Sequence, residues 1–242
     1  MMAKNKIGES ELVWRYFGCR TSGVFVDVGA NHPTINNQSW FLEKRGWTGV
    51  VIEPNPAHYK LLREQRPKSQ VFQTAVGAPN GPQDVTLHLA GPGLARHSKV
   101  HLSAHGSIST NAVRVKMTTL DYILEQSGIS KIDFLSIDVE GMEFDVLAGF
   151  TFEKYRPELF CIEDFCRDFA KKRYMRGVGY KLVRRVGYNN WYVPREAPAS
   201  AFSISTGRQF LRLIRKDLLS VPFAKARRGL RASRDPHRRV IN

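Results

Sequence analysis

Acidic and glycine residues that follow two short apolar runs are the residues of this sequence best suited to chemistry. An apolar, β-branched run contains Asp27 and is followed by Gly29 and Asn31. A second such run, residues 48–52, is followed directly by Glu53. In open α/β sheets, ligands bind at the carboxyl ends of parallel strands, where we expect these residues to gather. Two neighbouring strands that each carry an acid suit a ligand with an amine at one end and a ribose at the other.

Two other interpretations of the first turn compete with a site for such a ligand. An acid and a glycine after a strand are common in turns that bind nothing. A dinucleotide site is the closer competitor, but it requires G-x-G-x-x-G between strand and helix, whereas here Gly29 is followed by His32 and Pro33. The single glycine favours an adenosyl ligand without a pyrophosphate. S-adenosylmethionine is such a ligand, and it has both the amine and the ribose.

Size and composition indicate one globular domain followed by a basic tail. The chain has 242 residues, of which 42% are hydrophobic and 24% charged, enough for one α/β domain with a substantial core. Neither a membrane-spanning run nor the apolar core of a signal peptide is expected. Cys19, Cys161 and Cys166 have neither metal-ligand spacing nor a disulfide pattern, which is typical of a reducing compartment. We therefore expect a cytoplasmic protein.

The net charge of +15 is concentrated towards the C-terminus. Residues 204–242 hold 11 Lys and Arg against 2 acids and so carry +9 of this charge. On a helical wheel one arc of this segment is apolar, and the opposite arc holds Arg208, Arg212, Arg215 and Lys216. A basic amphipathic helix is typical of segments that lie on an anionic membrane surface, which would make the protein peripheral at the inner face of the membrane. Docking on the domain or on a second subunit, and a merely solubilising tail, are the other interpretations.

Strand-like and helical patterns alternate through the first 165 residues, which predicts a mostly parallel sheet wound on both faces by helices. The predicted strands cover residues 23–28, 49–52, 71–76, 113–117, 132–137 and 158–163, with an added edge strand at 84–89. The predicted helices cover residues 12–17, 37–44, 56–66, 119–126 and 141–148. An antiparallel pair, 180–185 and 190–193, is expected to close the sheet. Residues 90–109 show little periodicity and are expected to form a long loop.

Acids also follow the predicted strand 132–137, at Asp138, Glu140 and Glu143. A carboxylate there can act as a general base for a hydroxyl nucleophile. Asp138 and Glu140 are the first catalytic candidates, ahead of His32 and Glu163. Glu140 is equally well explained as an acid in the first turn of a helix, where the helix dipole favours it. Such acids can also hold Mg²⁺, but the spacing does not require it.

Three histidines in the aperiodic segment are candidate zinc ligands. His97, His101 and His105 recur every four residues, which would place them on one face of a helix. The glycines and serines around them disfavour a stable helix, and no cysteine is close in sequence. No metal site is therefore predicted.

Together these blocks resemble the FkbM family of S-adenosylmethionine-dependent methyltransferases. The resemblance is carried, in this order, by FVDVGAN (25–31), FLEKRGWTG (41–49), VIEPN (51–55), TLD (119–121) and IDVEGME (137–143). It implies a class I methyltransferase fold, which is Rossmann-like, and methyl transfer to a hydroxyl of a sugar, glycan or natural product. The C-terminal segment lies outside the resemblance, so we expect a methyltransferase domain over residues 1–199 and a basic tail over residues 200–242.

The methionine end of the cofactor is assigned to the first strand and its turn. We expect the Asp27 carboxylate to pair with the ammonium group of the ligand. Gly29 would let the ligand approach the backbone closely, and Asn31 is assigned to the same end of the site.

The nucleoside end is assigned to the second and third strands. Glu53 is expected to accept hydrogen bonds from the two ribose hydroxyls, and Asn55 is assigned to the same pocket. Ala75 and Val76, which are small and apolar, are expected to flank the adenine.

Two other functions compete with a small-molecule or glycan O-methyltransferase. The charge of +15 suggests a nucleic-acid methyltransferase, but much of that charge is in the tail and no module with stacking aromatic and basic residues is evident. Nucleic acid is therefore not expected as a partner. A non-catalytic scaffold that retains the fold is disfavoured by the complete set of strand-end acids.

Overall fold

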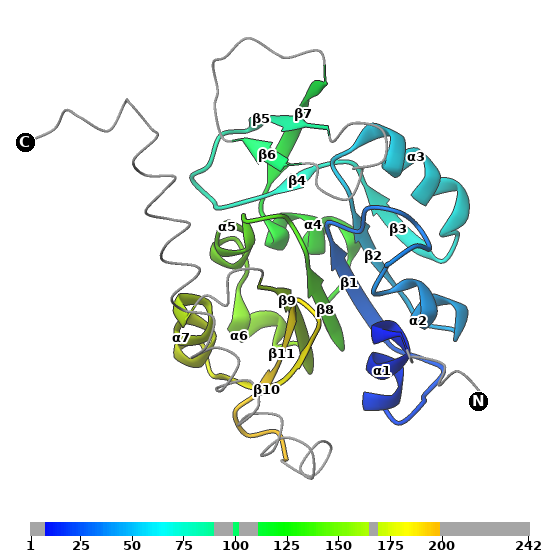
Figure 1. The fold of residues 1–242 in the computed structure, drawn as a ribbon, viewed down its shortest axis with the longest axis vertical. Helices are drawn as coiled ribbons and strands as arrows, with labels where there is room; N and C mark the ends of the chain where they lie inside the picture. Colours follow the sequence, from blue (N-terminus) through cyan, green and yellow to red (C-terminus); the bar gives the residue numbers. More distant parts are fainter. Residues whose placement is uncertain (1–7, 90–98, 102–110, 165–168, 199–242) are drawn as a thin grey trace, which may run out of the picture.

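The computed structural model describes residues 8–89, 99–101, 111–164 and 169–198. Its larger sheet contains β1 (Val24–Val28), β2 (Thr48–Ile52), β3 (Ser69–Phe72), β8 (Phe134–Ile137), β9 (Leu159–Glu163), β10 (Tyr180–Val186) and β11 (Asn189–Pro194). The seven strands follow the order β10-β11-β9-β8-β1-β2-β3 (Figure 1). A smaller, four-stranded sheet contains β4 (Ala75–Val76), β7 (Ala112–Thr118), β5 (Asp84–His88) and β6 (Lys99–His101), in that order.

Helices cover both faces of the larger sheet. One face carries α1 (Glu9–Tyr16), α2 (Trp40–Lys44) and α3 (Pro56–Gln65), and the other α4 (Leu120–Ser127), α5 (Glu143–Ala148), α6 (Phe152–Tyr155) and α7 (Phe169–Gly177). Successive side chains of a strand point to opposite faces, so Phe25 packs with Leu42 of α2 while Val26 packs with Leu124 of α4. The doubly wound α/β architecture predicted from the sequence is confirmed.

The register of the central strands brings their carboxyl ends level. β1 pairs in parallel with β2 and with β8, and Val28 lies opposite both Ile52 and Ile137. Glu53 and Asp138, the residues that follow those two partners, therefore flank the turn after β1. This is the sheet edge at which the sequence predicts a ligand.

The closing antiparallel pair is confirmed as well. β10 pairs with β11, and β11 pairs in turn with β9, also antiparallel. β11 is therefore an interior strand, and its residues Trp191 and Tyr192 are buried.

The smaller sheet corrects three predictions. The predicted strand 71–76 is divided between β3 and β4, and at the crossing the Thr74 hydroxyl donates to the carbonyl of Lys116 in β7, 3.0 Å away. The predicted edge strand 84–89 corresponds to β5, which lies between β7 and β6. β6 itself falls in the segment predicted to be a loop, because a strand of three residues is too short to show periodicity.

Two helices were not predicted, and several predictions cannot be compared with the structure. α6 has only four residues, and α7 buries little besides Met175 and the long side chain of Lys171, so neither shows a clear apolar period. His97, His105, Cys166 and the amphipathic segment lie outside the described residues, and so does the predicted domain boundary at residue 199. Among the described residues, no helix is long and apolar enough to span a membrane.

Candidate active site

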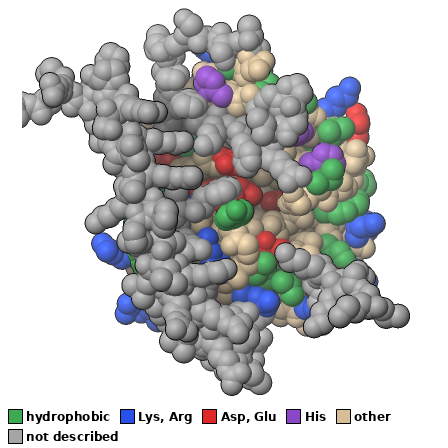
Figure 2. Space-filling view, viewed as in Figure 1, with side chains coloured by type: hydrophobic (Ala, Val, Ile, Leu, Met, Phe, Trp, Pro, Cys, Tyr) green, Lys and Arg blue, Asp and Glu red, His purple; other side chains and the backbone are tan. Residues whose placement is uncertain are grey.

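A cleft of about 670 Å³, counted with its open mouth, lies at the carboxyl ends of β1, β2 and β8 and is also lined by residues of β4 and β5. Figure 2 shows acidic side chains gathered in a hollow near the centre of this face. Seven of the predicted site residues line the cleft: Gly29, Asn31, Glu53, Ala75, Val76, Asp138 and Glu140. Asp27 and Asn55, assigned to the same site from the sequence, are not among the lining residues.

Gly29 is required by the packing of the strand ends. Its φ is 81°, and a Cβ added there would lie 1.9 Å from the carbonyl oxygen of Asp138. The backbone N–H groups of Gly29 and Ala30 both donate to the carbonyl of Ile52, at 2.9 and 3.1 Å. The turn therefore binds β1 to its two neighbours, a role for Gly29 that the sequence analysis did not consider.

Glu53 presents a carboxylate in a fixed orientation. Its Oε2 accepts from the backbone N–H of Asn31 at 2.7 Å, and its Oε1 accepts from the N–H of Asn55 at 2.8 Å. Burial raises the pKa of Glu53 to about 7, against the opposing effect of these two hydrogen bonds. Each oxygen retains a lone pair, so the group can accept hydrogen bonds from two adjacent hydroxyls.

Asn55 acts through the backbone rather than from the cleft wall. Its side-chain oxygen accepts from the N–H of Ala57 at 3.0 Å, which caps the start of α3 ahead of Pro56. The cap fixes the Asn55 N–H that donates to Glu53. Asn55 therefore orients the carboxylate that the cleft exposes.

Asp27 lies beneath the loop after β1 and is 2% exposed. Its Oδ2 accepts from the hydroxyl of Ser39 at 2.6 Å, and burial raises the pKa of the carboxyl. Strand alternation explains its position, because Asp27 points to the same face as Phe25, which α2 covers.

Part of the cleft wall is apolar. Ala75 and Val76 are each 4% exposed and line the cleft together with Leu87 and Met142. Such a wall suits a flat ring, as the sequence analysis expected for adenine.

Three carboxyl groups meet at the ends of β8 and β9. Oxygens of Asp138, Glu140 and Glu163 all lie within 4.8 Å of one another, and the carboxyls of Asp138 and Glu163 share a hydrogen bond. Burial raises the pKa of Asp138 to about 6, and burial together with the Asp138 charge raises the pKa of Glu163 to about 9. Oxygen ligands this close are also compatible with Mg²⁺, the possibility left open by the sequence.

Two cations hold the chain that carries Glu163. Lys171 of α7 donates to the Glu163 carbonyl at 3.0 Å and to Glu143 Oε2 at 2.7 Å. Arg185 donates to the carbonyl of Asp164 at 2.8 Å. These cations were not predicted from the sequence, because partners separated by 28 residues leave no local signal.

The two histidines near the cleft differ in role. His32, a reserve candidate for the base, accepts at Nδ1 from the N–H groups of Thr34 and Ile35, at 3.2 and 3.1 Å, and so fixes the local turn. His58 lines the cleft, and burial together with the charge of His32 lowers its pKa. A lone histidine in the first turn of a helix gave no signal for this position.

The residues of the cleft fit S-adenosylmethionine. Glu53 offers two fixed oxygens to a diol, the apolar wall suits a ring, and the acids that follow β8 suit the cationic end of the ligand. Asp138 both lines the cleft and belongs to the carboxyl cluster, so it joins the two.

Comparisons with known proteins agree with this architecture. The protein-family model described as "Methyltransferase FkbM domain" matches residues 27–182 of the chain. The fold is similar to that of methyltransferase FkbM from Methylobacillus flagellatus KT, with a TM-score of 0.50 and 15% identity over 78% of this chain and 48% of that chain. The present chain thus spans about half the length of that protein. The two share the class I methyltransferase fold.

Two further similarities are weaker or shorter. A TehB-like S-adenosylmethionine-dependent methyltransferase from Corynebacterium glutamicum is 12% identical, with a TM-score of 0.40 over 79% of this chain and 88% of that chain. The uncharacterized protein ORF4 of beak and feather disease virus is 37% identical over 73 residues, which are 29% of this chain and 69% of that protein.

Proposed function

The chain belongs to the FkbM methyltransferase family of S-adenosylmethionine-dependent enzymes, and we propose that it methylates a hydroxyl group of a sugar, glycan or natural product. The observation that carries the proposal is a fixed carboxylate, that of Glu53, in the same cleft as Asp138. The carboxyl of Asp138 is in turn hydrogen-bonded to that of Glu163, next to the cleft.

The cofactor is proposed to lie along the strand ends. Glu53 would accept from the ribose hydroxyls, and Ala75 and Val76 would flank the adenine. Gly29 and Asn31 form the wall beside the methionine end, and Asp27 acts on that end from beneath the loop. Support comes from the lining of the cleft and from the two hydrogen bonds that orient Glu53.

Catalysis is proposed to combine alignment with proton removal. When bound, S-adenosylmethionine supplies the methyl group. The protein holds the acceptor hydroxyl in line with it, and such alignment is the larger part of catalysis in a displacement of this kind. A carboxylate oxygen of Asp138 takes the hydroxyl proton, because an alcohol is a weak nucleophile. Glu140 lies close enough to assist from the same cluster.

A transfer assay tests the proposed acceptor class. The full-length protein is incubated with methyl-labelled S-adenosylmethionine and separated fractions of cellular glycans, lipids and RNA, and Asp138→Asn serves as the inactive control. We expect label in the glycan or glycolipid fraction. Label in RNA alone would replace the proposal with the nucleic-acid alternative. Cofactor binding without transfer to any fraction would instead favour a scaffold.

The basic segment suggests where the acceptor lies. On a helical wheel, four cations of the segment 204–242 fall opposite its apolar residues, a pattern that suits the surface of an anionic membrane. We propose that this segment holds the enzyme beside a lipid-linked acceptor. Its composition, rather than any contact, supports this part of the proposal.

A further inference from the structure

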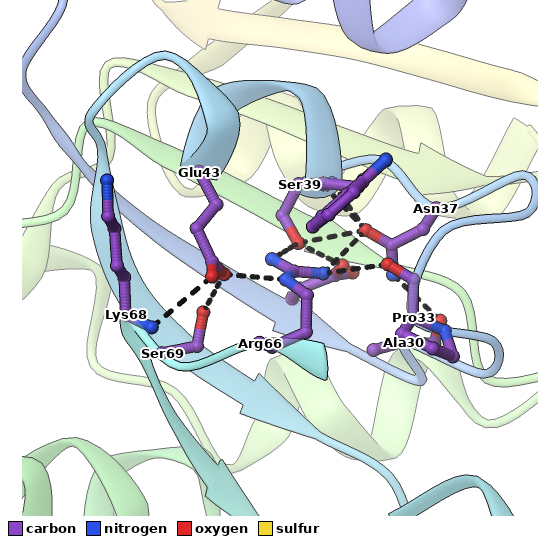
Figure 3. Close-up of polar contacts among 10 residues, drawn as sticks. Ala30, Pro33, Asn37, Ser39, Glu43, Arg66, Lys68 and Ser69 are labelled. Carbon is purple, nitrogen blue, oxygen red and sulfur yellow. Dashed lines mark hydrogen bonds and ion pairs between the residues drawn. The ribbon is translucent and has the colours of Figure 1, made fainter. Parts of the chain in front are cut away.

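Arg66, which follows α3, is the most buried cation among the described residues that contact the loop after β1. It is 1% exposed, and its guanidinium group lies between that loop and α2 (Figure 3). Burial of a charged group is costly unless it is paired and fully hydrogen-bonded. The hydrogen-bond partners of Arg66 therefore indicate which segment the buried guanidinium group stabilises.

One partner balances the charge, and the others belong to the loop. Arg66 Nε donates to Glu43 Oε2 at 2.6 Å, which forms a buried ion pair. The two remaining nitrogens donate to Ser39 Oγ at 2.9 Å, to Asn37 Oδ1 at 3.0 Å and to the carbonyl of Pro33 at 3.3 Å. A purely structural ion pair would need only Glu43, whereas these three contacts all reach residues 33–39.

The loop held in this way has an unusual backbone. Asn31 and Asn36 have φ angles of 55° and 54°, in the left-handed region that non-glycine residues seldom occupy. Such conformations persist where the surrounding structure over-determines them. Asn37 provides part of that restraint, because its Nδ2 donates to the Ala30 carbonyl at 2.9 Å while its Oδ1 accepts from Arg66. The result is an Asn31 N–H that points at Glu53.

Arg66 also sets the hydrogen bond to Asp27. A serine hydroxyl has one hydrogen to donate. Ser39 accepts from Arg66 Nη2, and its short contact of 2.6 Å with Asp27 Oδ2 is the bond that this hydrogen best makes. The direction of the Ser39 hydroxyl, and with it the position of the Asp27 carboxylate, therefore depends on Arg66.

We infer that Arg66, acting through Ser39 and Asn37, is a positioning residue for the amino-acid end of the cofactor. It holds the loop that carries Asn31 and it orients Asp27, while Glu53 keeps a second hydrogen bond, from the Asn55 N–H that the cap of α3 fixes. This inference rests on the proposed function. Loss of the network should weaken ligands that have the amino-acid group and spare ligands that lack it.

Two ligands separate these effects. S-adenosylhomocysteine has the amino-acid group, whereas methylthioadenosine keeps the adenosine and lacks that group. Each is titrated by calorimetry into the full-length wild-type protein, Arg66→Lys and Ser39→Ala, with Arg63→Lys as the matched control on the exposed face of α3. Ser39→Ala removes a single hydroxyl, so it decides the question if Arg66→Lys does not fold.

We expect Arg66→Lys and Ser39→Ala to bind S-adenosylhomocysteine about tenfold more weakly, the loss expected for one charge-assisted hydrogen bond, and methylthioadenosine with less than about twofold change. Arg63→Lys should bind both ligands as the wild type does. Equal losses for the two ligands, or no loss for either, would overturn the positioning role. A wild-type protein that binds neither ligand would instead contradict the proposed function.

Discussion

The carboxyl of Asp138, which follows β8, shares a hydrogen bond with the carboxyl of Glu163, the last residue of β9. β8 and β9 are adjacent and parallel, with Ile137 opposite Ile162, so the residues after this pair meet at the sheet edge. Two carboxyls this close cannot both ionise readily, which separates their pKa values. Asp138 is left as the stronger acid and hence, at neutral pH, as the member able to accept a proton.

Substitution of the proposed base should affect turnover more than cofactor binding. Asp138→Asn removes the proton acceptor with little change in volume, and Glu140→Gln removes the neighbouring carboxylate. A general base typically contributes about 10² to 10⁴ in rate. We expect a loss in that range for Asp138→Asn, a smaller one for Glu140→Gln, and none for Glu64→Gln on exposed α3. Steady-state kinetics on an identified acceptor would contradict this assignment if both variants turned over at the wild-type rate.

The pH dependence of turnover follows from the raised pKa of Asp138, about 6. The base must be deprotonated, so turnover should rise with pH through about 6 and fall about tenfold for each pH unit below it. A pH–rate profile at saturating cofactor measures the midpoint. A flat profile between pH 5 and 8 would show that removal of a proton by Asp138 does not limit the rate.

Glu163 should make the free energy of unfolding fall as pH rises, whereas turnover is expected to rise. Its pKa is raised from 4.5 to about 9 in the folded protein, so the unfolded chain loses this proton at lower pH than the native protein does. The stabilising contribution of the proton is complete below about pH 4.5 and is lost as pH rises towards 9. Glu163→Gln mimics the protonated form and should raise the melting temperature at pH 8 by at least about 2–4 °C, equivalent to about 1 kcal/mol. An equal shift for Glu64→Gln, or a shift that does not vary with pH, would argue against this role.

The basic segment provides a prediction that is independent of the cleft. Replacement of Arg208, Arg212, Arg215 and Lys216 by Gln should abolish flotation of the full-length protein with vesicles of phosphatidylserine and phosphatidylcholine. Each cation near an anionic surface contributes about 1 kcal/mol. Binding of the wild type should weaken as salt rises, because the screening length is about 10 Å at 0.1 M. Vesicles of phosphatidylcholine alone serve as the control. Equal flotation of the wild type and the variant would contradict a membrane role for the segment.

Sequence patterns located the cleft because its position depends on strand ends. Apolar runs that stop at Glu53 and Asp138 mark the carboxyl edge of a parallel sheet, and local composition is enough to find them. The same alternation that identifies a strand also places Asp27 on the face of Phe25, beneath α2. The position of Asp27 away from the cleft wall could therefore have been predicted from the sequence, although it was not.

Other features of the site depend on contacts between distant residues. Arg66 meets Ser39 across 27 residues, and Lys171 meets Glu143 across 28. Neither pairing follows from periodicity, because each depends on how two helices are placed on the sheet. The division of the predicted strand 71–76 between two sheets has the same origin, since it depends on the partner strand β7.

The binding of S-adenosylmethionine through Glu53 is the central claim, and titration calorimetry tests it most directly. The full-length wild type should bind the cofactor, and both Glu53→Ala and Glu53→Gln should bind it more than about tenfold more weakly, because the ribose hydroxyls would lose a hydrogen-bonding carboxyl group in a buried site. Glu64→Gln, on the exposed face of α3, should match the wild type. Wild-type affinity in both Glu53 variants, with the proteins folded, would contradict the assignment of the cleft.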